Sequence, residues 1–215
     1  MLILKRQLAN FQKGFANINV PSVLATLVSD ELDFPNLSMV GVDDRAAAYQ
    51  AVSYLIQQGH RKIAVLGGPA TSHPSMMRRQ GAQQAMEDAG IRFEDKLYGL
   101  SNYDFESAYH AMNGLLARRA EFTALFAMSD VIAFGAIRAL VSAGLRVPED
   151  VSVIGFDGIT MSRYCVPVMT TIVQPSEQIA LQSIELLVRQ IEHGAPAQTI
   201  TLQPELQQGE SVRAI

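Results

Sequence analysis

The sequence predicts an α/β fold in which parallel sheets carry helices on both faces. Short runs of almost wholly apolar residues, such as IAVL (63–66) and ALFAM (124–128), are typical of strands that are covered on both sides. Longer amphipathic segments lie between these runs, and several begin at Asp or Ser and stop at Gly. This regular alternation of strand and helix indicates a doubly wound sheet.

Each element follows from one of these two patterns. The strand-like runs are Leu2–Leu4, Val23–Val28, Ser38–Val42, Lys62–Leu66, Leu97–Ser101, Thr123–Met128, Val151–Phe156 and Thr199–Leu202. The predicted helices run from Asp43 or Asp44 through Gln57, over Met76–Asp88, from Asp104 through Leu116, from Ser129 to Gly144, and from Ser176 to Gly194. The last of these has an apolar stripe that contains Ile179, Ile184, Leu187, Val188 and Ile191.

Composition narrows the class of protein. The 215 residues allow one large domain or two small ones, and 48% hydrophobic with 18% charged residues excludes a disordered or fibrous chain. The net charge of −4 makes this chain by itself a poor candidate for binding nucleic acid. A single cysteine, Cys165, cannot form an internal disulfide. No apolar run spans a bilayer and MLILKRQLANFQ is no signal peptide, so we expect a cytoplasmic protein without membrane contact.

The sequence offers little enzyme chemistry. It has neither a Gly-x4-Gly-Lys loop nor Gly-x-Gly-x-x-Gly, and its four histidines lack metal-ligand spacing. Asp43–Asp44 and the pair Asp130 and Asp157 are possible acid–base groups, but each position also suits a helix or turn cap. Cys165 is a possible nucleophile or a buried or interface thiol. We therefore expect no enzyme, no metal and no cofactor, with a hydrolase or transferase that uses Asp157 or Cys165 as an alternative.

Binding residues are expected where the predicted strands end. In a doubly wound sheet the ligand crevice lies at the carboxyl ends of the strands. Arg78 offers a planar fork of donors, Asp157 follows VSVIGF with an acceptor pair, and Phe105 offers a ring face. These groups suit a sugar, whose hydroxyls need forked partners and whose C–H face stacks on an aromatic ring. The alternatives are a solvated helix charge for Arg78, core packing for Phe105 and a turn aspartate at 157.

Three segments together resemble one family. They read YLIQQGHRKIAVLGG (54–68), SDVIAFGAIRALVSAGLRVPEDVSVIGFDG (129–158) and PVMTTIVQP (167–175). In this order and at this spacing they closely resemble the lactose/galactose-repressor (LacI/GalR) family of bacterial transcription regulators. The resemblance runs from about residue 18 to the C-terminus.

The resemblance implies a type I periplasmic-binding-protein-like effector domain of two α/β lobes joined by crossover strands. A small molecule, usually a sugar or related metabolite, then binds between the lobes, and the domain forms a homodimer. A separate N-terminal helix-turn-helix reads the operator, and effector binding shifts the lobe arrangement and with it the affinity for DNA. A sugar-binding protein of a transport system, with the same architecture, is the alternative.

The resemblance also implies a domain division. Residues 1–41 and 174–203 correspond to part of the N-terminal lobe, and 42–173 with 204–215 to the C-terminal lobe. The helix-turn-helix and the first part of the N-terminal lobe are expected to be absent, so operator DNA would be bound only through that missing domain. An incomplete lobe exposes strand edges and apolar faces, which favours association with a second chain.

Seven positions are expected to contribute to the effector site. Arg78, Asp157 and Phe105 match the effector-contacting arginine, aspartate and aromatic platform of the family. Ser129 stands before Asp130 where the family usually has asparagine, which shortens the reach of that contact. Gly41 and Ser176 stand where some members carry larger side chains, so both changes would enlarge the pocket. The ligand-binding set is therefore Gly41, Arg78, Phe105, Ser129, Asp130, Asp157 and Ser176.

Overall fold

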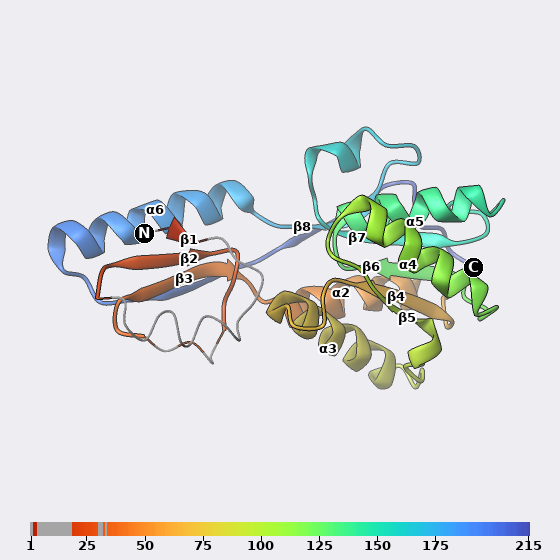
Figure 1. Ribbon diagram of the computed structural model, residues 1–215, viewed down its shortest axis with the longest axis horizontal. Coiled ribbons are helices and arrows are strands. Elements are labelled where there is room, and N and C mark those ends of the chain that lie inside the picture. The colour runs from red at the N-terminus through yellow and green to blue at the C-terminus, as the bar shows by residue number, and fades with distance from the viewer. Residues whose placement is uncertain (1, 4–18, 30–31, 33) are drawn as a thin grey trace. The chain divides into compact units, whose positions relative to one another are not determined.

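The computed structural model describes residues 2–3, 19–29, 32 and 34–215. Contacts divide the chain into two compact units. The first contains Met1–Asp43, Thr71–Pro74 and Gln174–Pro204, and the second contains Asp44–Ala70, Ser75–Val173 and Glu205–Ile215. Figure 1 shows their elements, and each unit is described below by itself.

The first unit is built on a four-stranded, wholly parallel sheet in the order β1–β2–β3–β9. The strands are β1 (Leu2–Ile3), β2 (Ser22–Ala25), β3 (Leu37–Val42) and β9 (Thr199–Leu202). Helix α6 (Ser176–His193) lies against β2 and β3, and Gly194 ends it with a positive φ of 61°. One core cluster joins the helix to the sheet and contains Val23, Ala25, Val40, Ile179 and Leu186.

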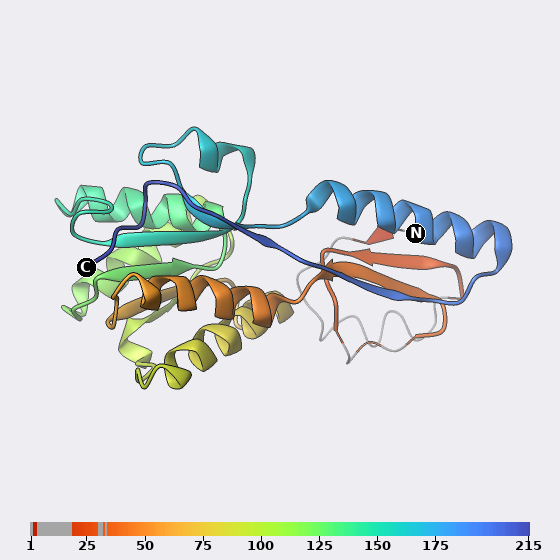
Figure 2. The same cartoon turned by 180° about the vertical axis from the view of Figure 1, so that it is seen from behind.

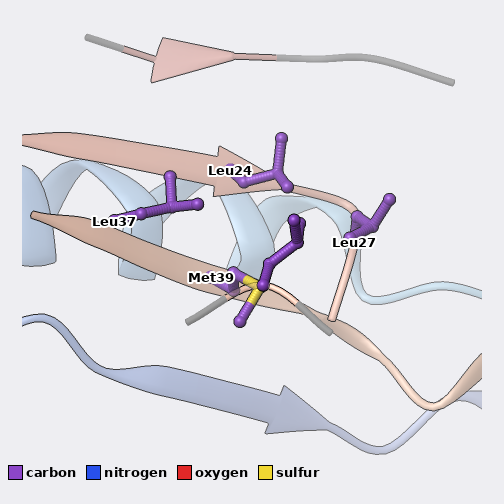
Figure 3. Close-up of a cluster of buried hydrophobic side chains, with 5 residues drawn as sticks. Leu24, Leu27, Leu37 and Met39 are labelled. Carbon is purple, nitrogen blue, oxygen red and sulfur yellow. The ribbon is translucent and has the colours of Figure 1, made fainter. Parts of the chain in front are cut away.

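A second apolar cluster of the first unit contains Leu24, Leu27, Leu32, Leu37 and Met39 (Figure 3). Leu24 and its neighbour Val23 belong to different clusters because successive side chains of a strand point to opposite faces of a sheet. Residues of β2 are buried on both faces, which explains why this strand is apolar almost throughout.

The second unit carries a six-stranded sheet in the order β10–β8–β7–β6–β4–β5. The strands are β4 (Ile63–Gly67), β5 (Tyr98–Leu100), β6 (Ala124–Ala127), β7 (Ser152–Asp157), β8 (Thr170–Val173) and β10 (Glu205–Gln207). Five of them are parallel, and β10 pairs antiparallel with β8 at one edge. The parallel sheet that the sequence predicts is confirmed, and β10 adds an antiparallel strand at its edge where the chain returns after the first unit.

Helices cover both faces of this sheet (Figures 1 and 2). Helices α4 (Phe105–Ala117) and α5 (Asp130–Ser142) pack on each other and on strands β4 to β7. Helices α2 (Asp44–Gln57) and α3 (His73–Asp88) lie on the opposite face. A hydrogen bond of 3.1 Å from the Tyr49 hydroxyl to Asp88 joins these two helices. Two short 3-10 helices, Asp95–Leu97 and Thr160–Arg163, complete the unit.

Most predicted elements are confirmed within one or two residues of their predicted ends. The strand predicted over Val23–Val28 is too long, because Thr26 has a φ of 68° and leaves the sheet. The helix predicted over Met76–Asp88 begins earlier, at His73. Leu4, predicted as strand, lies outside the described residues. In the described part of the chain, no helix combines the length and apolar character that a membrane span requires.

Candidate functional site

The second unit has a topological switch point between β4 and β6. From β4 the chain moves outward to its neighbour β5, and it then returns to place β6 on the other side of β4. Connections that leave two adjacent parallel strands in opposite directions open a crevice at the carboxyl ends of those strands. These ends are Gly67 and Ala127, so the residues that surround them are the candidates for ligand binding.

Arg78 of α3 reaches this point and is held there by two contacts. Its Nε donates to Asp44 Oδ1 at 2.7 Å, and its Nη1 donates to the carbonyl oxygen of Met128 at 2.5 Å. The guanidinium carbon lies 3.6 Å from the centre of the Phe156 ring. Among the described residues, Nη2 has no hydrogen-bond partner. The side chain is therefore a fixed fork with donors left over, and not the solvated helix charge that the sequence also allowed.

The charge of Arg78 is stable despite its burial. Arg78 is only 5% exposed, and burial by itself disfavours the charged form. The nearby carboxylates of Asp44 and Asp157 outweigh burial and raise the pKa of Arg78 above its usual range. The site therefore holds a permanent positive charge that is shielded from water on most sides.

Asp157 ends β7 and faces Arg78. Its Oδ1 lies 3.6 Å from Arg78 Nη1, and its side chain is 28% exposed. Its φ of 112° is one that residues other than glycine rarely adopt, so the surrounding structure must hold the backbone in place. Arg78 and Asp157 together present a donor fork and an acceptor pair at the switch point.

Asp130 belongs to the same edge of the sheet, but its carboxylate is satisfied by the protein itself. It is fully buried, and it accepts hydrogen bonds from Thr171 Oγ1 at 2.6 Å and from the backbone N–H of Ile159 at 2.8 Å. Burial raises the pKa of Asp130 to about 6, and the hydrogen bonds oppose that shift. The geometry favours a supporting role for Asp130 over direct contact with a ligand.

Ser129 and Phe105 both lie at helix starts. Ser129 caps α5, because its hydroxyl accepts from the backbone N–H of Ile132 at 3.1 Å. Phe105 is the first residue of α4, whose cap is Asp104. The Phe105 ring is 49% exposed, so the core-packing alternative is wrong and a ring face is accessible.

Gly41 and Ser176 belong to the first unit. Gly41 lies on β3, and a Cβ at this position would meet the backbone nitrogen of Leu27 at 2.9 Å. Close packing of the chain thus requires the absence of a side chain at Gly41 within its own unit. Ser176 is exposed at the first turn of α6, where its hydroxyl donates to the carbonyl of Gln174 at 3.4 Å.

Sequence reasoning assigned no binding role to two side chains that shape this site. It treated Asp44 as a helix cap or acid–base group, whereas Asp44 anchors Arg78 across 34 residues of sequence. It missed Thr171, which holds Asp130 across 41 residues. The position of Asp44 after a strand was a usable signal, whereas nothing in the local sequence of Thr171 marks its partner.

Comparison with known proteins gives concordant matches. Residues 52–212 match the family described as periplasmic binding protein-like domain. The chain is 35% identical over 201 residues to the HTH-type transcriptional regulator MalR of Clostridium butyricum. That alignment covers 93% of this chain and 60% of MalR. It is similar to the structure of a transcriptional regulator CelR–cellobiose complex, with 30% identity, a TM-score of 0.88 and coverage of 98% and 64%.

A third match is the structure of a LacI-family regulator. The structure is a sugar-binding transcriptional regulator of the LacI family from Escherichia coli in complex with phosphate, at 30% identity and a TM-score of 0.85. The alignment covers all of this chain and 77% of that one. The relatives are transcription regulators, which favours a regulator over the transport alternative. The chain spans only 60% of the length of MalR. The chain belongs to the LacI/GalR family, with the periplasmic-binding-protein-like fold, and covers the effector-binding region of that family.

Proposed function

We propose that this chain is the effector-sensing part of a bacterial transcription regulator and that it is not an enzyme. The effector is a sugar or related small metabolite, which binds at the Arg78–Asp157 pair. The observation that carries this proposal is the fixed guanidinium at the switch point, whose Nη2 has no hydrogen-bond partner among the described residues, with the carboxylate of Asp157 3.6 Å from Nη1. Two similar structures, a CelR–cellobiose complex and a sugar-binding regulator of the LacI family, support the class of ligand.

The whole protein, in this proposal, acts on operator DNA through a separate helix-turn-helix domain in the cytoplasm. Ligand binding changes the balance between two arrangements of the effector region and so changes the affinity for the operator. The acidic balance of this chain, with 21 acidic and 17 basic side chains, fits a region that leaves DNA contact to another domain.

We further propose that the chain forms a homodimer. The segment after β7 exposes four large apolar side chains, Ile159, Met161, Tyr164 and Val166, and Val166 is 93% exposed. Apolar side chains gathered on one exposed segment favour association. Val166→Asp should shift the particle mass in light scattering towards the monomer at micromolar concentration. A wild-type chain that is monomeric at every dilution would rule the dimer out.

Thermal melting against a panel of sugars, sugar phosphates and purines tests the ligand proposal. A compound at about 100 times its dissociation constant stabilises by about 2.7 kcal/mol and should raise the melting temperature by several degrees. Asp157→Asn should remove most of that shift in melting temperature. The substitution removes a charged acceptor and should weaken ligand binding by about 1.5–3 kcal/mol.

The matched control is Asp150→Asn, which removes an exposed carboxylate of the same unit and should leave the shift intact. A panel compound that stabilises the wild type and Asp157→Asn equally would show that Asp157 takes no part in binding.

A further inference from the structure

The buried carboxylate of Asp130 joins three segments of the chain at the ligand-facing edge of the sheet. Asp130 begins α5, Thr171 donates to it from β8, and Ile159 donates to it from the segment after β7. The Ile159 amide comes two residues after Asp157, so this hydrogen bond fixes the chain just beyond the point where Asp157 leaves its strand.

The neighbouring strand leaves room for this carboxylate. Gly155 lies on β7, and a Cβ at this position would lie 2.2 Å from Asp130 Oδ1. Any side chain at 155 would therefore displace the carboxylate or the strand. This close packing indicates that the position of the Asp130 carboxylate depends on glycine at 155, because a buried strand would otherwise accept a residue with a side chain there.

One short segment holds both members of the ligand-facing pair. Met128 accepts from Arg78, and two residues later Asp130 accepts from the segment that follows Asp157. The φ of 112° at Asp157 has an energetic cost and persists only while its surroundings hold it. We propose that Asp130 is a positioning residue, which keeps Asp157 opposite Arg78 through its hydrogen bond to the amide of Ile159. The relevance of this pair to a ligand rests on the proposed function.

The protonation state of Asp130 gives a direct way to observe this role. Burial raises the pKa of Asp130 to about 6, against the effect of the Thr171 and Ile159 hydrogen bonds. The charge of Asp157 acts in the same direction as burial, and the charge of Asp130 in turn raises the pKa of the Cys165 thiol, after the larger effect of burial. A protonated carboxyl is a weaker acceptor than a carboxylate, so acid should weaken the bond to the Ile159 amide.

The test is an NMR titration of the isotope-labelled chain between pH 4.5 and 7.5, without any ligand. The amide proton of Ile159 should shift with a midpoint near pH 6, and the Nε–H signal of Arg78 should follow with the same midpoint. An Ile159 amide that does not respond to pH would overturn the proposal. So would an Arg78 signal that ignores the transition at Ile159, because a merely structural role for Asp130 would leave Arg78 unaffected.

Four variants assign the transition. Thr171→Val keeps the shape of the side chain and removes a bond that favours the carboxylate, so the midpoint should rise above 6. Asp130→Asn should abolish the transition, and both Asp157→Asn and the exposed control Asp150→Asn should retain it. If Asp130→Asn does not fold, the wild-type and Thr171→Val titrations still decide, and an unchanged midpoint in Thr171→Val counts against the proposal. Since no ligand is used, these results are independent of the ligand panel, which tests the proposed function.

Discussion

The two ends of the six-stranded sheet differ in how completely their buried polar groups are paired. At the carboxyl ends, Nη2 of Arg78 has no hydrogen-bond partner among the described residues, and Asp157 is held in an uncommon backbone conformation. At the amino ends, His60 is buried beside Thr123, which directly precedes β6. His60 Nδ1 lies 2.9 Å from the Thr123 hydroxyl and Nε2 lies 3.1 Å from the carbonyl of Arg213. The carbonyl can only accept, so Nε2 carries the proton and Nδ1 accepts from the hydroxyl.

The C-terminal segment supplies further hydrogen-bond partners for buried polar groups at the amino ends of the strands. The hydroxyl of Ser211 donates to the carbonyl of Val153 at 2.6 Å and accepts from the backbone N–H of Thr170 at 2.8 Å. Polar groups with all their partners inside the protein contribute to stability, whereas leftover donors beside a strained residue are available to a ligand. The comparison therefore separates a stabilising edge of the sheet from a binding edge.

Replacement of Arg78 should have the largest effect. Arg78→Ala removes the cation from a buried ion pair with Asp44 and should cost about 3–5 kcal/mol of unfolding free energy, measured by urea denaturation. Arg78→Lys should recover little, because a point charge cannot reproduce the planar fork.

The neighbouring variant Arg79→Ala is the control for Arg78, since the side chain of Arg79 is 42% exposed and its partner Asp95 is nearly free in solvent. Equal stability losses in the two variants would contradict the distinction between the two arginines.

The next largest effect is expected at the stabilising edge. His60→Ala leaves the Thr123 hydroxyl and the Arg213 carbonyl unpaired and should cost about 1–3 kcal/mol by urea denaturation. Ligand-induced stabilisation should stay at the wild-type value, because His60 belongs to the opposite edge of the sheet. A lost ligand response in a folded His60→Ala chain would break the proposed separation of the two edges.

A pH series sharpens the prediction for His60. Burial lowers the pKa of His60 below its usual 6.5, so the unfolded chain takes up a proton at a higher pH than the folded chain. The stabilising contribution of neutral His60 is therefore complete above about pH 7 and declines as the pH falls below 6.5. The stability difference between the wild type and His60→Ala should shrink between pH 7.5 and 5.5. The comparison with His60→Ala isolates the effect of His60, because Asp130, whose pKa is raised, changes the stability of both chains in the opposite direction as the pH falls.

Ser129 should show a smaller effect. Ser129→Ala removes the cap of α5 and should cost about 1 kcal/mol in unfolding free energy. Ser129→Asp restores a capping side chain and should recover most of that loss. If the serine also contacts the effector, Ser129→Ala will reduce ligand-induced stabilisation as well, and a calorimetric titration with the panel compound that binds distinguishes the two roles.

The smallest effect is expected for an exposed ion pair of the same unit. Arg146 contacts Asp150 through Nε at 2.8 Å and through Nη2 at 3.0 Å, but the arginine is largely in solvent. Arg146→Gln should leave the melting temperature within experimental error, because water and salt screen such pairs. A loss comparable to that of Arg78→Ala would show that burial does not explain the difference between the two ion pairs.

Local sequence was sufficient for most of the fold. Apolar runs such as IAVL predict strands because both faces of such a strand must be covered, and β4 is indeed buried throughout. Cap residues predict helix starts because they satisfy free backbone N–H groups, as Asp104 and Ser129 do. The edge strand β10 was not predicted, because its three residues are too few to establish a periodic signal.

For the candidate site, too, local sequence predicted some features and the tertiary structure decided others. The sequence by itself determined the α/β alternation, the candidate residues Arg78 and Asp157, and the place of Asp157 after a strand, since these depend on local pattern and on the resemblance of three segments to a family. Only the tertiary structure decided that Asp44 anchors Arg78, that Thr171 holds Asp130, and that Gly155 makes room for the carboxylate. These partners are brought together by strand order, and a hydrogen bond between residues 34 or 41 positions apart leaves no trace in the local sequence of either one.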